Sequence, residues 1–251
     1  MLFLCFSSKD RNDIVEALLF HLSNYGISVW YDRNKILMGD DRNYKNFVEG
    51  VGGCNYAVVI LSPNCVSSVC ANEEIDLIHD RHKKGRVTVF PIFYKIEAEA
   101  VPEKYNWMKK MVYKELSARD DSRGACNHIM CKLLVDELEK YRIRSLQAFT
   151  DICRPYSAHQ YIARILRTYD EISHENRNAR IALLYAAFQF IVTHYCLDSI
   201  PAFYYKGIER IFLETKLNIH IDLRETLIVE RSFLLLLNVA VFGYIIQDTD
   251  N

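Results

Sequence analysis

Apolar runs and amphipathic stretches alternate along the first 145 residues of the chain. A short continuous apolar run is typical of a strand buried on both faces, whereas apolar residues three and four apart indicate one face of a helix. The runs predict four strands and a weaker edge strand, at Leu2–Phe6, Ile27–Tyr31, Asn55–Leu61, Val87–Tyr94 and Met111–Tyr113. Helices are predicted from Asp13 to a stop at Gly26, at Tyr44–Val51, from a cap at Ser67 or Ser68 to a stop at Gly85, at Pro102–Lys110 and at Asn127–Arg142, with polar loops at Asp32–Asp41 and Asp121–Gly124.

Strands that alternate with helices imply a parallel sheet covered by helices on both faces. The predicted fold class is therefore α/β, a flavodoxin-like five-stranded parallel sheet in the common order 2-1-3-4-5, followed by an all-α part. This order has its topological switch between strands one and three, and ligands bind outside the carboxyl ends of the strands there. The loops Ser7–Arg11 and Ser62–Ser68 are expected to meet at that point.

One carboxylate, that of Glu74, lies on the apolar side of a predicted helix, where a solvated charge is not expected. Counted at 100° per residue, an apolar stripe is formed by Cys70, Ala71, Ile75, Leu77 and Ile78. Glu74 falls inside the stripe, whereas Glu73 falls outside it. Such a carboxylate is costly unless it is paired, neutralised or facing a cleft, and desolvation raises its pKa, a common device for acid–base chemistry. There are two alternatives: Glu74 forms a structural ion pair with a nearby Lys or Arg, or the helix is less regular than the count of 100° per residue assumes.

The alternation of strands and helices ends at about Leu146. Four helices are predicted beyond it, at Ser157–Ile172, Asn178–Leu197, Ala202–Leu217 and Leu223–Ile246. Two stretches without charge, Ile181–Leu197 and Ser232–Ile246, fall short of the ~20 residues that a bilayer span prefers, which favours buried helices over membrane insertion. The chain is therefore predicted to hold an α/β domain at 1–145 and a helical domain at 146–251 that drives oligomerisation or senses a signal.

Composition excludes several classes of protein. The 251 residues are half hydrophobic, the formal net charge is −1, and no block of five like charges suggests a nucleic-acid surface. The eight cysteines form no C-x-x-C and no cluster with His at zinc spacing, so no metal site is expected. Most lie in apolar runs, such as Cys5 and Cys196, as reduced thiols of a cytoplasmic protein do. The start of the chain has a strand pattern rather than that of a signal peptide.

Four motifs resemble those of Toll/interleukin-1 receptor (TIR) domains of the prokaryotic type. They are Phe3–Arg11; Gly26–Asp32 with Gly39–Asp41; Tyr56–Pro63 with Ser68-x-Cys70-x-x-x-Glu74-Ile75; and Phe90-Pro91-Ile92. The resemblance covers about residues 1–145. It implies cleavage of NAD+ between nicotinamide and ribose, with Glu74 as the essential residue, NAD+ as the substrate, and no metal or cofactor. It also implies self-association through the TIR domain and a role in immune defence, with an upstream sensor or a downstream effector as partner.

The resemblance suggests which residues surround the substrate. The candidate substrate-binding residues are Phe6, Ser7, Ser8, Tyr31, Lys35, Gly39, Ser62 and Cys70. Several have ordinary alternatives: the serines can simply form turns, Lys35 can be solvated, and Cys70 can be a core thiol. Arg11 is expected to pair with Asp10 or Asp13 rather than with phosphate.

Cys70 departs from the pattern, because the family often has Trp at that position. A thiol cannot stack on a substrate ring, although Phe6, Trp30 or Tyr31 can supply one. The sequence thus leaves two functions open. One is an NAD+ hydrolase or cyclase that makes ADP-ribose, or a cyclic or conjugated form of it. The other is an inactive TIR scaffold that acts through TIR–TIR assembly.

Overall fold

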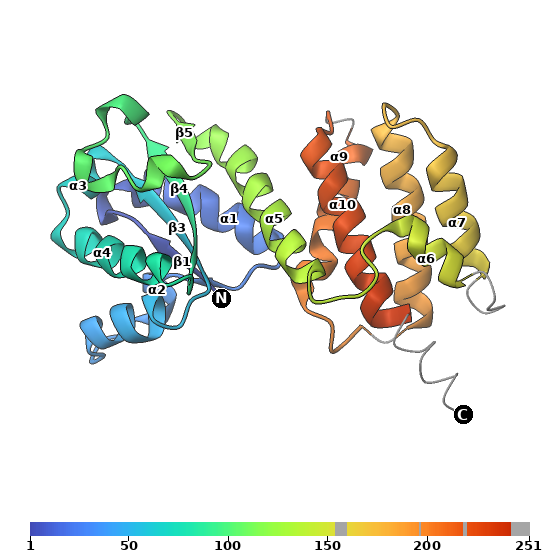
Figure 1. The fold of residues 1–251 in the computed structure, drawn as a ribbon, viewed down its shortest axis with the longest axis horizontal. Helices are drawn as coiled ribbons and strands as arrows, with labels where there is room; N and C mark the ends of the chain where they lie inside the picture. Colours follow the sequence, from blue (N-terminus) through green and yellow to red (C-terminus); the bar gives the residue numbers. More distant parts are fainter. Residues whose placement is uncertain (154–159, 196, 218–219, 242–251) are drawn as a thin grey trace. The chain divides into compact units, whose positions relative to one another are not determined.

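The computed structural model describes residues 1–153, 160–195, 197–217 and 220–241 (Figure 1). Internal contacts divide the chain into two compact units. The first unit comprises Met1–Ser23 with Ile27–Cys126, and the second comprises Asn24–Gly26 with the part from Asn127 onward. The sequence alone placed the boundary after residue 145; the contacts instead assign most of the last helix of the α/β pattern to the second unit.

A five-stranded parallel sheet forms the first unit, in the order β2-β1-β3-β4-β5 (Figure 1). The strands are β1 (Leu2–Cys5), β2 (Val29–Trp30), β3 (Tyr56–Leu61), β4 (Thr88–Tyr94) and β5 (Lys114–Leu116). The predicted fold class and strand order are confirmed. The prediction of the edge strand at Met111–Tyr113 is wrong, because Met111 and Tyr113 pack against the hydrophobic core and the ladder with β4 forms only from Lys114 onward.

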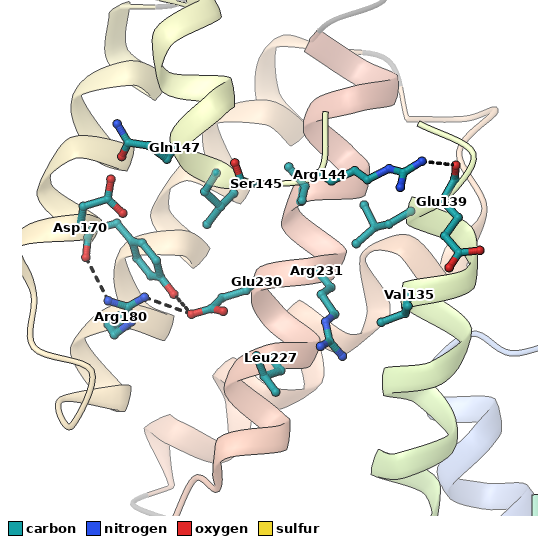
Figure 2. A pocket seen from close by; sticks show the side chains of 14 residues that line it. Val135, Glu139, Arg144, Ser145, Gln147, Asp170, Arg180, Leu227, Glu230 and Arg231 are labelled. Atoms are coloured by element: carbon teal, nitrogen blue, oxygen red, sulfur yellow. Dashed lines mark hydrogen bonds and ion pairs between the residues drawn. The ribbon is translucent and has the colours of Figure 1, made fainter. Parts of the chain in front are cut away.

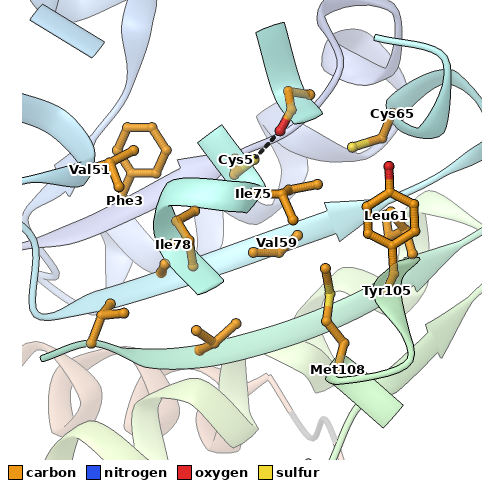
Figure 3. Packing of buried hydrophobic residues seen from close by; sticks show 14 of the residues in the cluster. Phe3, Cys5, Val51, Val59, Leu61, Cys65, Ile75, Ile78, Tyr105 and Met108 are labelled. Atoms are coloured by element: carbon orange, nitrogen blue, oxygen red, sulfur yellow. Dashed lines mark hydrogen bonds between the residues drawn. The ribbon is translucent and has the colours of Figure 1, made fainter. Parts of the chain in front are cut away.

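Alternate residues of a strand point to opposite faces of the sheet, and one face carries the core shown in Figure 3. Phe3 and Cys5 from β1 lie there with Val59 and Leu61 from β3. The segments that follow β2, β3 and β4 cover these side chains with Val51, Cys65, Ile75, Ile78, Tyr105 and Met108. The cover thus includes the helix that carries Glu74.

The helices predicted after β1, β2 and β3 are present in the first unit, together with shorter helical segments that were not predicted. They are η1 (Ser8–Asp10), η2 (Arg11–Val15), α1 (Glu16–Asn24), α2 (Asp32–Lys35), η3 (Tyr44–Val51), α3 (Pro63–Val66), α4 (Val69–Lys83), η4 (Ala98–Ala100), η5 (Glu103–Tyr105), η6 (Met108–Lys110) and η7 (Arg119–Asp121). The predicted loop Asp32–Asp41 begins with the short helix α2. The predicted helix at Pro102–Lys110 is instead two 3-10 turns, η5 and η6. Helix α5 (Ser122–Leu138) begins inside the predicted loop Asp121–Gly124, because Gly124 does not interrupt the helix.

The second unit is helical, as predicted. Besides α5 it contains α6 (Leu146–Cys153), α7 (Gln160–Glu171), α8 (Arg177–His194), η9 (Ala202–Tyr204), α9 (Lys206–Lys216), α10 (Leu223–Leu236) and η10 (Leu237–Val241). Helix α6 was not predicted. The positions 157–159, 196 and 242–246, which fall in predicted helices or apolar runs, lie outside the described residues. No helix in the described part is both long enough and apolar enough to cross a membrane.

Asn24, the last residue of α1, and the two residues after it belong to the second unit. Tyr25 is fully buried, and its hydroxyl donates a hydrogen bond of 2.5 Å to Oδ1 of Asn127. Gly26 has a φ of 72°, and a Cβ there would lie 2.8 Å from the backbone of Ala202. The helix stop predicted at Gly26 is therefore also a close contact that no other residue type fits.

A pocket of about 520 Å³ lies in the second unit, between α5, α6, α7, α8 and α10 (Figure 2). The buried Arg180 forms an ion pair of 3.1 Å with Glu230, and Tyr169 donates a hydrogen bond to the same carboxylate. The Arg180 guanidinium lies 3.8 Å from the centre of the Tyr169 ring. These contacts offset part of the cost of burying the Arg180 charge in this wall of the pocket.

Candidate active site

Glu74 lies on the buried side of α4. The Oγ of Ser68 accepts a hydrogen bond of 3.3 Å from the backbone N–H of Ala71, so Ser68 is the N-cap that starts the helix. From this start the helical period turns Glu74 toward the sheet, where it is 6% exposed, and leaves Glu73 in solvent. The sequence predicted both orientations.

Two side chains contact one carboxylate oxygen of Glu74. Asn46, on η3, donates from Nδ2 at 2.6 Å to Oε1, and the Sγ of Cys70 lies 3.7 Å from the same atom. The thiol of Cys5, at the end of β1, is also hydrogen-bonded to Glu74, and it lies 3.7 Å from the carbonyl oxygen of Ala71. Among the described residues no Lys or Arg forms an ion pair with Glu74, so the structural pairing considered above is not present.

The Glu74 carboxylate is difficult to ionise. Burial raises its pKa from 4.5 to about 7, because the charged form loses its hydration. Hydrogen bonds from the thiols of Cys5 and Cys70 lower the pKa, but by less than burial raises it. More distant charges act in opposite directions, with Asp32 raising the pKa and Arg42 lowering it. Both protonation states of Glu74 are therefore well populated at neutral pH, as an acid–base residue requires.

Cys70 is half-buried one helical turn before Glu74. Its Sγ lies 3.6 Å from Nη2 of Arg42 and 3.9 Å from Nδ2 of Asn46. Burial raises the pKa of the Cys70 thiol, and the Glu74 charge raises it further. Cys70 is thus a protonated neighbour of Glu74 rather than an activated nucleophile.

Phe6 and Tyr31 form a second cluster with Arg11. The two rings stack with centroids 6.0 Å apart, and the guanidinium of Arg11 lies 5.0 Å from the centre of the Phe6 ring. Arg11 donates at 2.8 and 2.7 Å to the two carboxylate oxygens of Asp32, and at 2.7 Å to the Tyr31 hydroxyl. The prediction that Arg11 pairs with Asp10 or Asp13 is wrong, because the fold places Asp32, the first residue of α2 after the neighbouring strand β2, within reach of both guanidinium nitrogens.

The three candidate serines lie in the loops after β1 and β3, and two of them are held by structural hydrogen bonds. Ser7 caps η1 by accepting from the backbone N–H of Lys9 at 3.4 Å, while Ser8 is exposed. The Ser62 hydroxyl accepts from the N–H of Cys65 at 2.9 Å and donates at 2.5 Å to the buried carboxylate of Asp10. The bond between Ser62 and Asp10 joins the two loops predicted to meet at the topological switch.

Lys35 and Gly39 lie on the segment after β2 and are exposed. Lys35 ends α2, and Gly39 has a φ of 98°, a conformation that other residues rarely adopt. Among the described residues, no contact is recorded between either of these two and Glu74, so their place in the site stays a prediction.

Two residues next to the carboxylate were not predicted from the sequence. Asn46 is 4% exposed on a segment whose other buried residues are Gly50 and Val51, and a polar amide on that face was the signal available. Arg42 directly follows the predicted polar loop Asp32–Asp41, and nothing in the sequence pointed to it. Among the described residues no group of three or more His, Cys, Asp or Glu side chains is arranged to hold a metal ion.

The fold and the site define a class of α/β protein with a buried acidic residue at the carboxyl end of a parallel sheet. The TIR domain family matches residues 2–130, about half of the chain, and the chain belongs to this family. Its resemblance to prokaryotic TIR proteins is thereby confirmed.

Curated relatives of the chain include two bacterial enzymes. A 2' cyclic ADP-D-ribose synthase of Bacteroides thetaiotaomicron is 33% identical over 99 residues, which are 39% of this chain and 34% of that protein. An NAD(+) hydrolase of Paracoccus denitrificans is 28% identical over 100 residues, 40% of this chain and 33% of the relative. The chain thus spans about a third of the length of the curated relatives it matches. Among solved structures, the TIR domain of a Toll-related receptor from Hydra magnipapillata is 19% identical, with a TM-score of 0.39 over 48% of this chain and 86% of that one.

Proposed function

We propose that this chain cleaves NAD+ at the bond between nicotinamide and ribose and releases ADP-ribose or a cyclic or conjugated form of it. The observation that carries the proposal is Glu74, a buried carboxylate without a cationic partner among the described residues. Folding alone does not favour a charge in this position, because an apolar residue would remove the desolvation cost. NAD+ is the substrate, and the proposed chemistry needs no cofactor.

Glu74 can act in two ways during such a reaction. As the bond breaks, its electron pair moves to the nicotinamide nitrogen and a positive, oxocarbenium-like ribosyl centre develops. An ionised Glu74 stabilises that centre electrostatically. When water attacks the ribosyl carbon, the same carboxylate accepts the proton that water loses. A pKa near 7 suits this role, since the group is partly ionised beforehand and can hold the proton afterwards.

The relatives support the reaction class but leave the product open. One matched relative is named a cyclic ADP-D-ribose synthase and another an NAD(+) hydrolase, so both outcomes occur on similar domains. The nucleophile decides between them: water gives the linear product, and a hydroxyl of the substrate itself gives a ring. The cytoplasmic location and the defence role are further parts of the proposal and rest on the family resemblance alone.

A non-catalytic scaffold is the second candidate, and two observations favour it. Cys70 offers no ring on which a substrate base could stack. In addition, several large apolar side chains are exposed on the segment after β2, on η3 and at the start of α4, namely Leu37, Met38, Tyr44, Val48 and Val69. Exposed apolar side chains on these segments suit a protein interface, such as TIR–TIR assembly.

Nicotinamide release from NAD+ separates the two candidates. Purified full-length protein is incubated with NAD+ at pH 7, with and without a crowding agent that promotes assembly, next to Glu74→Gln. The enzyme proposal expects release by the wild type and none by the variant. Absence of release from the assembled wild-type protein contradicts the enzyme proposal and supports the scaffold.

Self-association is a further part of the proposal. We expect residues 146–251 to hold the chain in a homo-oligomer, because a small helical domain leaves much apolar surface uncovered. Light scattering on the full-length protein measures the mass directly. A strictly monomeric chain with full NAD+-cleaving activity contradicts this expectation.

A further inference from the structure

Asn46 contacts the Glu74 carboxylate at a place where a simple packing residue would do. Its side chain is 4% exposed, and its Nδ2 donates to Oε1 of Glu74 at 2.6 Å. Its other amide atom, Oδ1, is buried and has no hydrogen-bond partner in the described structure. A buried carbonyl without a partner costs stability, so an apolar residue of the same size would pack here at lower cost.

The amide is the main hydrogen-bond donor to an ionised Glu74. The other groups that face this carboxylate are the thiols of Cys5 from β1 and Cys70 from α4, which are weak donors. Of the charged side chains that act on Glu74, the carboxylate of Asp32 opposes a negative charge and Arg42 favours it, without an ion pair, while the Cys65 thiol from α3 is kept protonated by burial. Hydrogen bonds to a charged acceptor are stronger than neutral ones, so the bond from Nδ2 stabilises the ionised form specifically.

An amide also suits the protonated form of the same carboxyl group. If its end turns over, Oδ1 takes the place of Nδ2 and accepts the hydrogen bond that a protonated Glu74 donates. In either orientation one amide atom meets Oε1 and the other stays unpartnered. The orphan Oδ1 is therefore what a residue that serves both protonation states would show, and leucine in its place would serve neither.

We propose that Asn46 is the positioning residue of Glu74: it holds the carboxyl group in one rotamer and turns its amide as Glu74 gains and loses its proton. The assignment of a catalytic role to Glu74 rests on the proposed function, whereas the coupling between the amide and the proton does not. In the proposed reaction, Asn46 keeps Oε1 fixed while the proton from the nucleophile arrives, so that the carboxyl group does not have to rearrange.

The proton on Glu74 can be followed without any activity, through its neighbour Cys70. The alkylation rate of a thiol normally rises with pH, because more of the reactive thiolate forms. The Glu74 charge raises the pKa of the Cys70 thiol, so the rate of Cys70 alkylation rises less steeply where Glu74 ionises, and a plot of rate against pH has a break there. Full-length protein is treated with iodoacetamide at a series of pH values, and the modification of Cys70 is quantified by peptide mass spectrometry. The wild type should show a break near pH 7, and Glu74→Gln should show none.

Three substitutions test the role of Asn46. Asn46→Leu keeps the branched shape of the side chain and removes the donor, so the break should move up by about one pH unit, the size of one lost charge-assisted hydrogen bond. Asn46→Asp places a second carboxyl group against Glu74 and should move the break further up, and it keeps the test open if the leucine variant does not fold. Asn43→Leu, at the exposed position directly before η3, is the matched control and should leave the break in place.

The kinetics of NAD+ cleavage give a second measurement of the same shift. The pH profile of kcat/KM for NAD+ should shift with the break in the Asn46 variants, and kcat should fall by about tenfold or more. Breaks at the wild-type pH in both Asn46 variants overturn the inference. Shifted breaks in proteins that release no nicotinamide support the role of Asn46 and reject the proposed function, so the two failures are distinguishable.

Discussion

Substitution of Glu74 by glutamine should make the protein more stable while removing its activity. Glutamine keeps the shape of the side chain and cannot ionise. At about 1.4 kcal/mol for each pH unit, a pKa raised from 4.5 to about 7 means that ionised Glu74 costs about 3 kcal/mol of folding free energy. The folded state binds this proton more tightly than the unfolded chain does. Its contribution to stability is therefore complete below pH 4.5 and is lost as the pH rises through 7.

The expected difference between the two proteins thus depends on pH. At pH 8.5 the Glu74→Gln variant should exceed the wild type by about 3 kcal/mol in the free energy of unfolding, and near pH 4.5 the difference should largely disappear. Trp30 and Trp107 are the two tryptophans of the chain and both lie in the first unit. Urea unfolding followed by tryptophan fluorescence therefore reports on the unit that contains Glu74, without interference from the helical unit.

Glu73→Gln is the matched control, because Glu73 is exposed on the same helix. It should change neither the stability at any pH nor nicotinamide release, whereas Glu74→Gln should lower release by a factor of ~10² to 10⁴ or more. Two outcomes would refute the reasoning. One is an equal loss of activity in both variants, and the other is a stability difference for Glu74→Gln that does not change with pH.

Three further substitutions test the fold around the site and in the helical unit. Asp32→Asn removes the charge that faces Arg11, and should cost about 2 kcal/mol at pH 7 in the tryptophan assay. Burial raises the pKa of Asp32, but Arg11 outweighs it and lowers that pKa, so the cost should shrink in acid. Gly26→Ala should lower the melting temperature measured by circular dichroism, because φ is 72° and the new Cβ would lie 2.8 Å from the backbone of Ala202. Asp222→Ala removes the capping box of α10 and should lower the free energy of unfolding by about 1 kcal/mol, which is seen as a lower melting temperature. An unchanged melting temperature would contradict the role of the cap.

Local sequence patterns were sufficient to predict most of the fold of the first unit. The apolar runs at the strand positions, the stop at Gly26 and the serine cap before Val69 each depend on neighbours in the chain, so their consequences can be predicted without a structure. The same holds for the buried side of α4, because helical periodicity alone places Glu74 there and Glu73 in solvent. The edge strand was misplaced because a three-residue strand has too few positions to show a pattern.

Contacts between distant segments were beyond the reach of the sequence. Arg11 has nearby carboxylates in the chain at Asp10 and Asp13, yet it pairs with Asp32, since β1 and β2 lie side by side in the sheet. Asn46 gives no sign in the sequence that it meets Glu74, 28 positions away. The sequence alone therefore determined which element carries the acid and which way it points. Only the tertiary structure decided what surrounds it, because hydrogen-bond partners and desolvation depend on how the elements pack.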